Sequence, residues 1–279
     1  MKILTKISAF SVGLLMLLSA FSPALAIPSL ITAPAMNLAG VNGTAYESLN
    51  WSGYAVTDST TGSVTSVSGS WVVPAVTGTS NSYAAFWTGI DGFSDSTVEQ
   101  TGTISYMNGP TPTYYAWYEF YPAAMVQINL KVTADTISVG DFMSATVSYS
   151  ATTKLFTATI SDTTKGWTYT TTATVSGAKE TSAEWIVEAP SSNIGILPLA
   201  DFKTADFGTD YTSVPSTCYA TVGGNTGAIG SFGSAVQSIT MVTNRGVLKD
   251  SISALSSDGT SFYATWDSSG STGPGGFGR

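Results

Sequence analysis

The sequence predicts an all-β protein, either an antiparallel β-sandwich or a closed barrel. From Asn50 onward, short runs of alternating apolar and polar residues are separated by Gly, Asn, Asp and Pro, the pattern of half-buried strands joined by turns. Thr, Val, Tyr and Trp dominate these runs, which favours strands. No stretch keeps a 3.6-residue apolar period over three turns, so no long helix is expected. The regular spacing of the runs indicates one domain.

The first 26 residues have the three parts of a secretory signal peptide. Lys2 and Lys6 make the start positive, residues 9–18 form an apolar core, and the small residues Ala24 and Ala26 mark a cleavage site. Because the apolar core is too short for a comfortable membrane span, an uncleaved anchor is the weaker alternative. The chain is therefore expected to be secreted, with no membrane association after cleavage.

Three further segments complete the predicted organisation. Residues 27–47 are rich in small residues and turn formers and lack strand alternation, so they are expected to be a short propeptide or a linker. Residues 48–267 hold the predicted strands and form the sandwich domain. Residues 268–279 are a Gly/Ser-rich tail that has little to bury and is expected to be disordered.

Charge limits the partners of the mature chain. The predicted signal peptide holds two of the ten basic residues and none of the 18 acidic ones. The remaining chain is acidic and should repel nucleic acid and anionic membranes. Only 10% of the residues are charged. Solubility therefore depends on Ser, Thr, Asn and Gly, which suits an acidic medium.

The sequence has no histidine and one cysteine, Cys218. Without histidine, the chain cannot form a Ser-His-Asp triad, a Cys-His pair or a zinc site of the usual kind. A single cysteine excludes an internal disulfide and a multi-thiolate metal site. No metal and no cofactor is therefore expected, and any catalysis must use carboxylates, amides, hydroxyls or lysines.

Several polar residues lie in segments that should form buried strands. In SAEWIVE, Glu184 and Glu188 share one face with Ile186, because side chains alternate along a strand. They lie about 13 Å apart, and two buried carboxylates are costly without a partner or a purpose. Gln100 shares a face with Val98 and other apolar residues in the same way. The plainer interpretation of Gln100 is an amide that ties down a neighbouring loop.

Aromatic residues surround a further carboxyl group. In YYAWYEFYP, Glu119 shares a face with Trp117 and Tyr121. This arrangement fits either a binding groove or core packing with Glu119 at the solvent edge. Trp87 and Asp91 lie where a strand enters a glycine-flanked turn, and Asp91 fits an Asx turn.

Taken together, these segments resemble the glutamic peptidases, or eqolisins. The family's order and approximate spacing are matched by NWSGY, SGSWVVP, FWTGIDG, EQTG, YYAWYEFYP, ISVGD and AEWIVE. The resemblance covers residues 48–267 and depends on the combination of motifs, not on one of them. It implies a sandwich of two large curved antiparallel sheets, like concanavalin or jelly-roll folds, with a catalytic Gln–Glu pair in the concave groove.

The resemblance also implies roles for individual residues. By motif, Gln100 of EQTG and Glu184 of AEWIVE would be the catalytic pair. A carboxylate can take a proton from water and return it to the leaving amine, while a carboxamide stabilises the oxyanion. Six further residues would bind substrate or support the pair, namely Trp51, Trp87, Asp91, Trp117, Glu119 and Glu188.

The expected function is thus a secreted, acid-active endopeptidase that acts on polypeptides as a monomer and is insensitive to pepstatin. The chain departs from the better-known fungal members in two ways. Those members are commonly disulfide-bonded, whereas Cys218 is alone here, and the predicted propeptide is short. Neither departure involves Gln100 or Glu184.

Two other functions stay open from the residues alone. A glycoside hydrolase on a sandwich fold would stack sugars on Trp side chains and use Glu119 and Glu184 as acid and nucleophile. Such a pair must lie about 5–9.5 Å apart. A secreted adhesin or carbohydrate-binding sandwich would explain the Ser/Thr surface and the aromatic residues, but not the inward-facing Gln and Glu.

Overall fold

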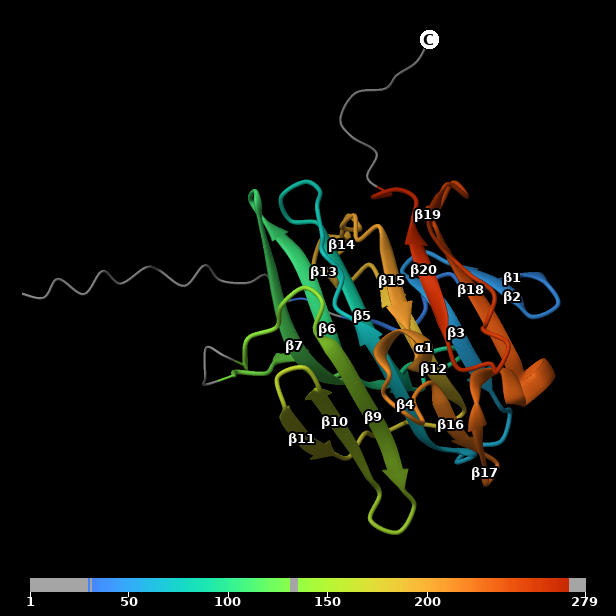
Figure 1. The fold of residues 1–279 in the computed structure, drawn as a ribbon. Coiled ribbons are helices and arrows are strands. Elements are labelled where there is room, and N and C mark those ends of the chain that lie inside the picture. Colours follow the sequence, from blue (N-terminus) through green and yellow to red (C-terminus); the bar gives the residue numbers. More distant parts are fainter. Residues whose placement is uncertain (1–29, 31, 131–134, 271–279) are drawn as a thin grey trace, which may run out of the picture.

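The protein folds into two packed antiparallel β-layers (Figure 1). The computed structural model describes residues 30, 32–130 and 135–270. The predicted β-sandwich is confirmed, and the described strands do not close into a barrel. The described helices are short, as expected: α1 (Thr209–Thr212) and the 3-10 helix η2 (Ile229–Ala235).

The first sheet carries the candidate residues. Its strands are antiparallel and follow the order β8 (Val126–Gln127), β7 (Thr111–Tyr121), β6 (Val98–Asn108), β5 (Tyr83–Ile90), β12 (Ser182–Glu188), β3 (Trp51–Thr57) and β18 (Val236–Val242). Strand β12, which carries Glu184 and Glu188, therefore lies between β5 and β3, although both are far from it in sequence.

The second sheet packs against the first. Its order is β11 (Trp167–Ala173), β10 (Leu155–Asp162), β9 (Phe142–Ser150), β4 (Val64–Val72), β15 (Thr204–Phe207), β20 (Phe262–Trp266) and β19 (Leu248–Ile252). Strand β16 (Tyr219–Val222) pairs with β4 and with β17 (Asn225–Ala228), and β13 (Ser191–Ser192) forms a small hairpin with β14 (Gly195–Ile196).

Strand β18 joins the two layers. Its residues Val236 to Ile239 pair with β3 of the first sheet, and Met241 and Val242 pair with β19 of the second. The sandwich is thus one long strip of strands that folds over at β18.

Large apolar side chains fill the space between the sheets. Phe86 and Trp185 from the first sheet and Trp71, Phe207 and Phe262 from the second are all buried there. The rings of Phe207 and Phe262 stack with centroids 4.8 Å apart. Burying each large apolar side chain contributes about 1.5–3 kcal/mol to folding, so this interface is the main source of stability.

The other side of the first sheet, which we call the outer face, is also buried. Its apolar cluster includes Trp51, Trp87, Trp117, Ile186 and Leu30. Every residue of β5 and of β12 is buried, as expected for strands covered on both sides. Carboxylates on β12 therefore lie in an apolar environment whichever way they point.

The two ends of the domain differ in part from the expectation. Residues 27–47 were expected to lack strands, but β1 (Ala39–Asn42) and β2 (Ala45–Ser48) form a hairpin. Strand β2 also pairs in parallel with β18. Strands of only four residues are too short to show a clear alternation of apolar and polar residues, which is why the sequence did not predict them. At the other end, the carbonyl of Ser269 accepts a hydrogen bond from the N–H of Leu199 at 3.0 Å. The predicted signal peptide and residues 271–279 lie outside the described residues.

None of the helices in the part of the chain that the structure describes has the length and apolar character to span a bilayer.

Candidate active site

Gln100 and Glu184 lie in one row across the first sheet. Gly89 of β5 pairs with Glu184 on one side and with Gln100 on the other, and Gln100 pairs in turn with Glu119. Directly paired residues on neighbouring strands point to the same face. The side chains of Gln100 and Glu184 therefore both project from the outer face, and their Cα atoms are two strand spacings apart, about 9.6 Å.

Gly89 leaves the space between these two side chains open. A Cβ atom at this position would lie 2.9 Å from the Cβ of Gln100 and 3.1 Å from Cζ3 of Trp87. Both contacts are shorter than the separation at which carbon atoms attract each other. A glycine is thus the residue that lets Gln100 and Glu184 face each other across β5.

The amide of Gln100 is oriented by two acceptors. Its nitrogen Nε2 donates to Oγ1 of Thr32 at 2.9 Å and to Oε2 of Glu119 at 3.1 Å. The hydroxyl of Thr32 donates to the same Glu119 oxygen. Among the described residues, the Gln100 oxygen Oε1 has no hydrogen-bond partner.

Glu119 is part of this cluster and is not at the solvent edge. Its side chain is only 1% exposed. Burial raises the pKa of Glu119 to about 8, although the hydrogen bonds from Thr32 and Gln100 oppose the shift. At acidic pH Glu119 is therefore neutral. The interpretation of Glu119 as an exposed edge residue is wrong, because the outer face is itself covered.

Glu184 is completely buried, and neither of its carboxyl oxygens has a hydrogen-bond partner among the described residues. Burial raises the pKa of Glu184 well above its usual range. The nearby carboxylates of Asp91 and Asp95 add to this effect. The buried surroundings of Glu184 therefore favour the neutral form of its carboxyl group over the charged form.

Glu188 lies on the same face but has several partners. Its Oε2 accepts a hydrogen bond from Nε1 of Trp87 at 2.9 Å. Its Oε1 accepts from the backbone N–H of Ala33 at 3.1 Å and from Nδ2 of Asn50 at 3.4 Å. Burial raises the pKa of Glu188, and these three donors act in the opposite direction. Glu188 therefore ties together three separate segments of the chain.

The three candidate tryptophans line the outer face beside this row. Trp87 and Trp117 lie in the next row of the sheet, on either side of Gly102. Trp51 packs edge-on against Trp87, with ring centroids 4.9 Å apart. All three rings are buried and form an apolar wall next to Gln100.

Asp91 is placed differently from the other candidates. Its Oδ2 accepts the backbone N–H groups of Lys179 and Glu180, and its Oδ1 accepts that of Thr181, each at 2.8 Å. These bonds join the end of β5 to the turn that precedes β12, whereas an Asx turn bonds the residue's own neighbours. Asp91 thus fixes the segment that delivers Glu184 and does not lie in its row.

Three residues of the site are not among the sequence candidates. Gly89 carries a recognisable signal, because a glycine inside a strand often marks a close approach of groups. Thr32 carries none, and Asn50 is marked only as the first residue of the NWSGY motif, since the roles of both depend on how Leu30 and residues 32–37 lie on the sheet. No local pattern encodes that long-range contact.

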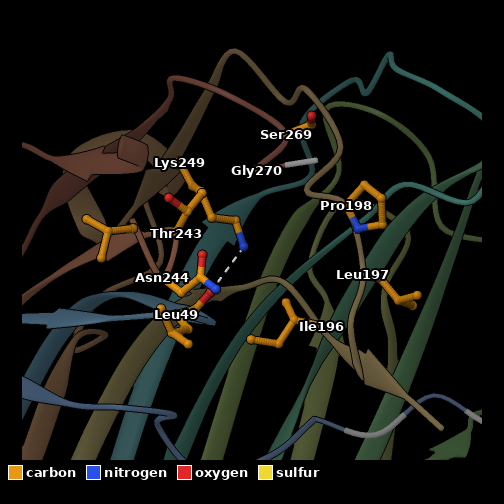
Figure 2. Close-up of a pocket in the computed structure, with 10 residues that line it drawn as sticks. Leu49, Ile196, Leu197, Pro198, Thr243, Asn244, Lys249, Ser269 and Gly270 are labelled. Carbon is orange, nitrogen blue, oxygen red and sulfur yellow. Dashed lines mark hydrogen bonds between the residues drawn. The ribbon is translucent and has the colours of Figure 1, made fainter. Parts of the chain in front are cut away.

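A cavity of about 360 Å³ lies apart from this row (Figure 2). Lys249 projects into it and donates to the carbonyl of Leu49 at 3.1 Å. Burial lowers the pKa of Lys249 to about 8. None of the residues of the Gln100–Glu184 row lines this cavity, so the cavity is not part of the candidate active site.

Comparison with known proteins gives the class of this molecule. A model of the Peptidase A4 family matches residues 49–255. The chain belongs to the Peptidase A4 family. It is therefore a peptidase, and the resemblance drawn from its sequence motifs is confirmed.

Individual relatives support the same assignment. Aspergillopepsin-2 from Aspergillus niger is 31% identical over 214 residues, which are 67% of this chain and 70% of that protein. The crystal structure of aspergilloglutamic peptidase from Aspergillus niger is 28% identical, with a TM-score of 0.55 over 67% of this chain and 99% of its own. Scytalido-glutamic peptidase with a transition state analog inhibitor has a similar fold, with a TM-score of 0.63 at 24% identity, over 78% of this chain and 98% of its own.

Proposed function

We propose that the protein is a secreted endopeptidase that works in acid, with Glu184 as general base and Gln100 as oxyanion donor. One observation carries the proposal. Glu184, Gly89 and Gln100 are in register across three adjacent strands, on a face lined by tryptophans. A carboxyl and a carboxamide project from that face there, and the strand between them carries a glycine, with no side chain of its own.

Each group fits a separate part of the reaction. Ionised Glu184 would take a proton from a water molecule as the water attacks the peptide carbonyl, and would then return it to the leaving nitrogen. The Gln100 amide would donate to the developing oxyanion, which is typically worth about 3–4 kcal/mol. The neutral form of Glu119 would help to hold the Gln100 amide in this orientation. No imidazole is needed, so the chemistry is compatible with acid.

The geometry disfavours a glycosidase that uses Glu119 and Glu184. Gly89 and Gln100 separate these residues in the row, so their Cα atoms lie three strand spacings apart, about 14 Å. The Glu119 carboxyl is also engaged with Gln100 and Thr32. A pair of carboxyl groups with a free path between them is what that reaction needs.

Location and assembly belong to the same proposal. The signal-like N-terminus and the low charge density support secretion into an acidic medium. The substrates are polypeptides, and the working unit is a monomer. The Trp51, Trp87 and Trp117 side chains would contact the substrate or support the walls of its groove.

The experiment uses the secreted protein and an unfolded protein as substrate, at acidic pH with a chelator present. We expect cleavage, unaffected by pepstatin, which is aimed at paired aspartates. The variants Q100A and E184Q should each lower kcat/KM by at least a hundredfold, which is about 2.7 kcal/mol, while circular dichroism shows an intact fold.

The conservative variant S66A, on β4 of the second sheet, is the control and should cleave at the parent rate. Retention of full activity by Q100A or by E184Q would rule out the proposed pair. Release of reducing sugar from a polysaccharide without any proteolysis would favour the glycosidase instead.

A further inference from the structure

The cavity that Lys249 enters is built from segments that are far apart in the sequence. Leu49 comes just before β3, Val242 ends β18, and residues 196–198 lie at and after β14. At about 360 Å³ the cavity is large enough for a small ligand, since such pockets are about 300–1,000 Å³ in size. Asn244 on its border is exposed, so the cavity is open to solvent.

Lys249 is the only charged residue among those that line the cavity. It is 5% exposed, and its amino group points into the cavity (Figure 2). Gly270 packs closely on the aliphatic stem, because a Cβ atom at this glycine would lie 2.7 Å from Cε of Lys249. The amino group is therefore held in place by the packing around its stem.

The amino group of Lys249 uses only part of its capacity for hydrogen bonds. It donates to the carbonyl of Leu49 at 3.1 Å, and a protonated lysine has three N–H donors. In the described ranges, the ion pairs join Lys165 to Asp141 and Lys203 to Asp201, and neither includes Lys249. Lys249 thus has donors directed at the cavity without an acceptor from the described protein.

The two carboxyl groups that act on Lys249 do not neutralise it. Glu188 and Asp250 are the acids whose charges affect its pKa, but Glu188 accepts from Trp87 and Asp250 accepts from Ser52. Burial raises the pKa of both acids well above the usual range, which favours their neutral forms. Lys249, with a pKa of about 8, is positive in acid. A buried positive charge without a counter-ion is costly, so the cavity favours an anion.

The rest of the wall selects the body of that anion. Most of the other lining side chains are apolar, namely Leu49, Ile196, Leu197, Pro198 and Val242. A carboxylate attached to an aliphatic group matches both parts of the cavity. The C-terminal residue of a peptide has this chemistry, and its carboxyl group is ionised above about pH 4. A peptidase releases such an end with every bond that it cleaves.

We propose that this cavity is a second binding site of the peptidase and that it binds the C-terminal residue of a peptide. Lys249 pairs with the carboxylate, and the apolar wall holds an aliphatic side chain. A free aliphatic acid shares this chemistry and is the other source of such a ligand. The inference needs only that the chain is a peptidase, as its family shows, and does not depend on the Gln100–Glu184 pair.

The first test compares two peptides by titration calorimetry at pH 5. The protein is the full chain with E184Q, and mass spectrometry checks that the peptides stay intact. The probes are acetyl-Ala-Ala-Leu with a free C-terminal carboxylate and the same peptide with a C-terminal amide. We expect the acid to bind at least tenfold more tightly than the amide. This comparison needs no change in the cavity, and equal affinity would overturn the proposal.

The second test removes the charge of Lys249. K249M in the E184Q chain should bind the acid peptide at least tenfold more weakly than the E184Q parent. The matched control is K179M in the same chain, which removes the same charge from an exposed residue outside the cavity and should bind as the parent does. Thermal unfolding should show that all three chains are folded. Undiminished binding by K249M, or an equal loss in K179M, would overturn the proposal.

The third test separates the two sources of the ligand. The probe 4-methylpentanoate keeps the aliphatic group and the carboxylate without a peptide, and acetyl-Ala-Ala-Gly keeps the peptide without the aliphatic side chain. Both should bind to the E184Q chain at least tenfold more weakly than acetyl-Ala-Ala-Leu. Equal binding of 4-methylpentanoate would assign the cavity to free aliphatic acids and overturn the peptide as its ligand. Equal binding of acetyl-Ala-Ala-Gly would overturn the role of the apolar wall.

These outcomes are independent of the proposed function. If the acid peptide binds through Lys249 but the chain with Glu184 cleaves no protein, the proposed function fails and this inference stands. If that chain cleaves and the acid and amide bind equally, this inference fails and the proposed function stands.

Discussion

Gly89 separates Gln100 from Glu184 without filling the space between them. The sequence alone predicted the two polar residues and their faces, because alternation along a strand is a local property. It did not predict which glycine lies between them, since this depends on the register of three strands. For the same reason, the burial of Glu119 was not evident from its own strand.

The first prediction concerns G89A. A methyl group at this position would press on the Cβ of Gln100 and on the backbone oxygen of Glu99, each at 2.9 Å. The Gln100 amide must then shift, and a displacement of about 1 Å in a catalytic group can cost about a hundredfold in rate. We expect kcat/KM on a peptide substrate to fall by at least tenfold, with the fold retained.

The matched control for G89A is G40A. A Cβ atom on Gly40 of β1 would make only an ordinary contact of 3.7 Å with Tyr46. Its activity should equal that of the parent. Equal kcat/KM for G89A, G40A and the parent would show that the open space at position 89 has no part in the reaction.

Strands are the elements that the sequence predicted best. Alternation and β-branched residues marked most of them, and the structure confirms the runs around Gln100, Glu119 and Glu184. The position of β12 between β5 and β3 could not be predicted, because pairing partners far apart in sequence leave no local pattern. The short strands β1 and β2 were missed for a similar reason.

The second prediction concerns the turn that leads into β12. D91A removes the acceptor for the N–H groups of Glu180 and Thr181, which are buried. Each buried donor left without a partner costs about 1–3 kcal/mol. Asp91 also has φ of 70°, a region that Asp tolerates better than Ala. We expect the free energy of unfolding, measured with urea, to fall by about 3 kcal/mol.

D58A is the control for this element. Asp58 accepts the N–H of Thr60 at 2.8 Å in an exposed turn, where water can replace it. Its free energy of unfolding should stay within about 0.5 kcal/mol of the parent. A loss in D91A no larger than in D58A would contradict the role assigned to Asp91.

At the scale of the whole molecule, the sandwich was predictable from composition and strand spacing, and the resemblance supplied its two-sheet form. The sequence could not predict that the two sheets are joined through β18, because a strand that pairs with both sheets has no sequence signature. The lone Cys218 is fully buried, and burial raises the pKa of its thiol to about 12. The described part of the chain is therefore held without a disulfide, by packing, hydrogen bonds and ion pairs such as Lys165–Asp141.

Buried carboxyl groups give the molecule a common dependence on pH. Burial raises the pKa of Glu99 to about 10 and that of Glu119 to about 8, and it raises the pKa values of Glu184 and Glu188 well above their usual range. Between about pH 5 and 8 the folded chain therefore holds more protons than the unfolded chain, whose carboxyls titrate near pH 4.3. The free energy of unfolding must then fall as pH rises. Lys249, with its pKa lowered to about 8, acts in the opposite sense, but only from about pH 7 upward.

The last prediction follows from this sign. The melting temperature should be highest near pH 5 and should decrease steadily to pH 8, as measured by differential scanning calorimetry. In the E99Q variant, the free energy of unfolding should fall with pH less steeply, by about 1.4 kcal/mol per pH unit, because the variant lacks one of the retained protons.

D258N is the control, since hydrogen bonds lower the pKa of exposed Asp258 and place its titration below this range. A melting temperature that is constant or rises from pH 5 to pH 8 would show that these carboxyl groups are not buried as described. Such a result would also mean that the fold is not more stable in acid than at neutral pH.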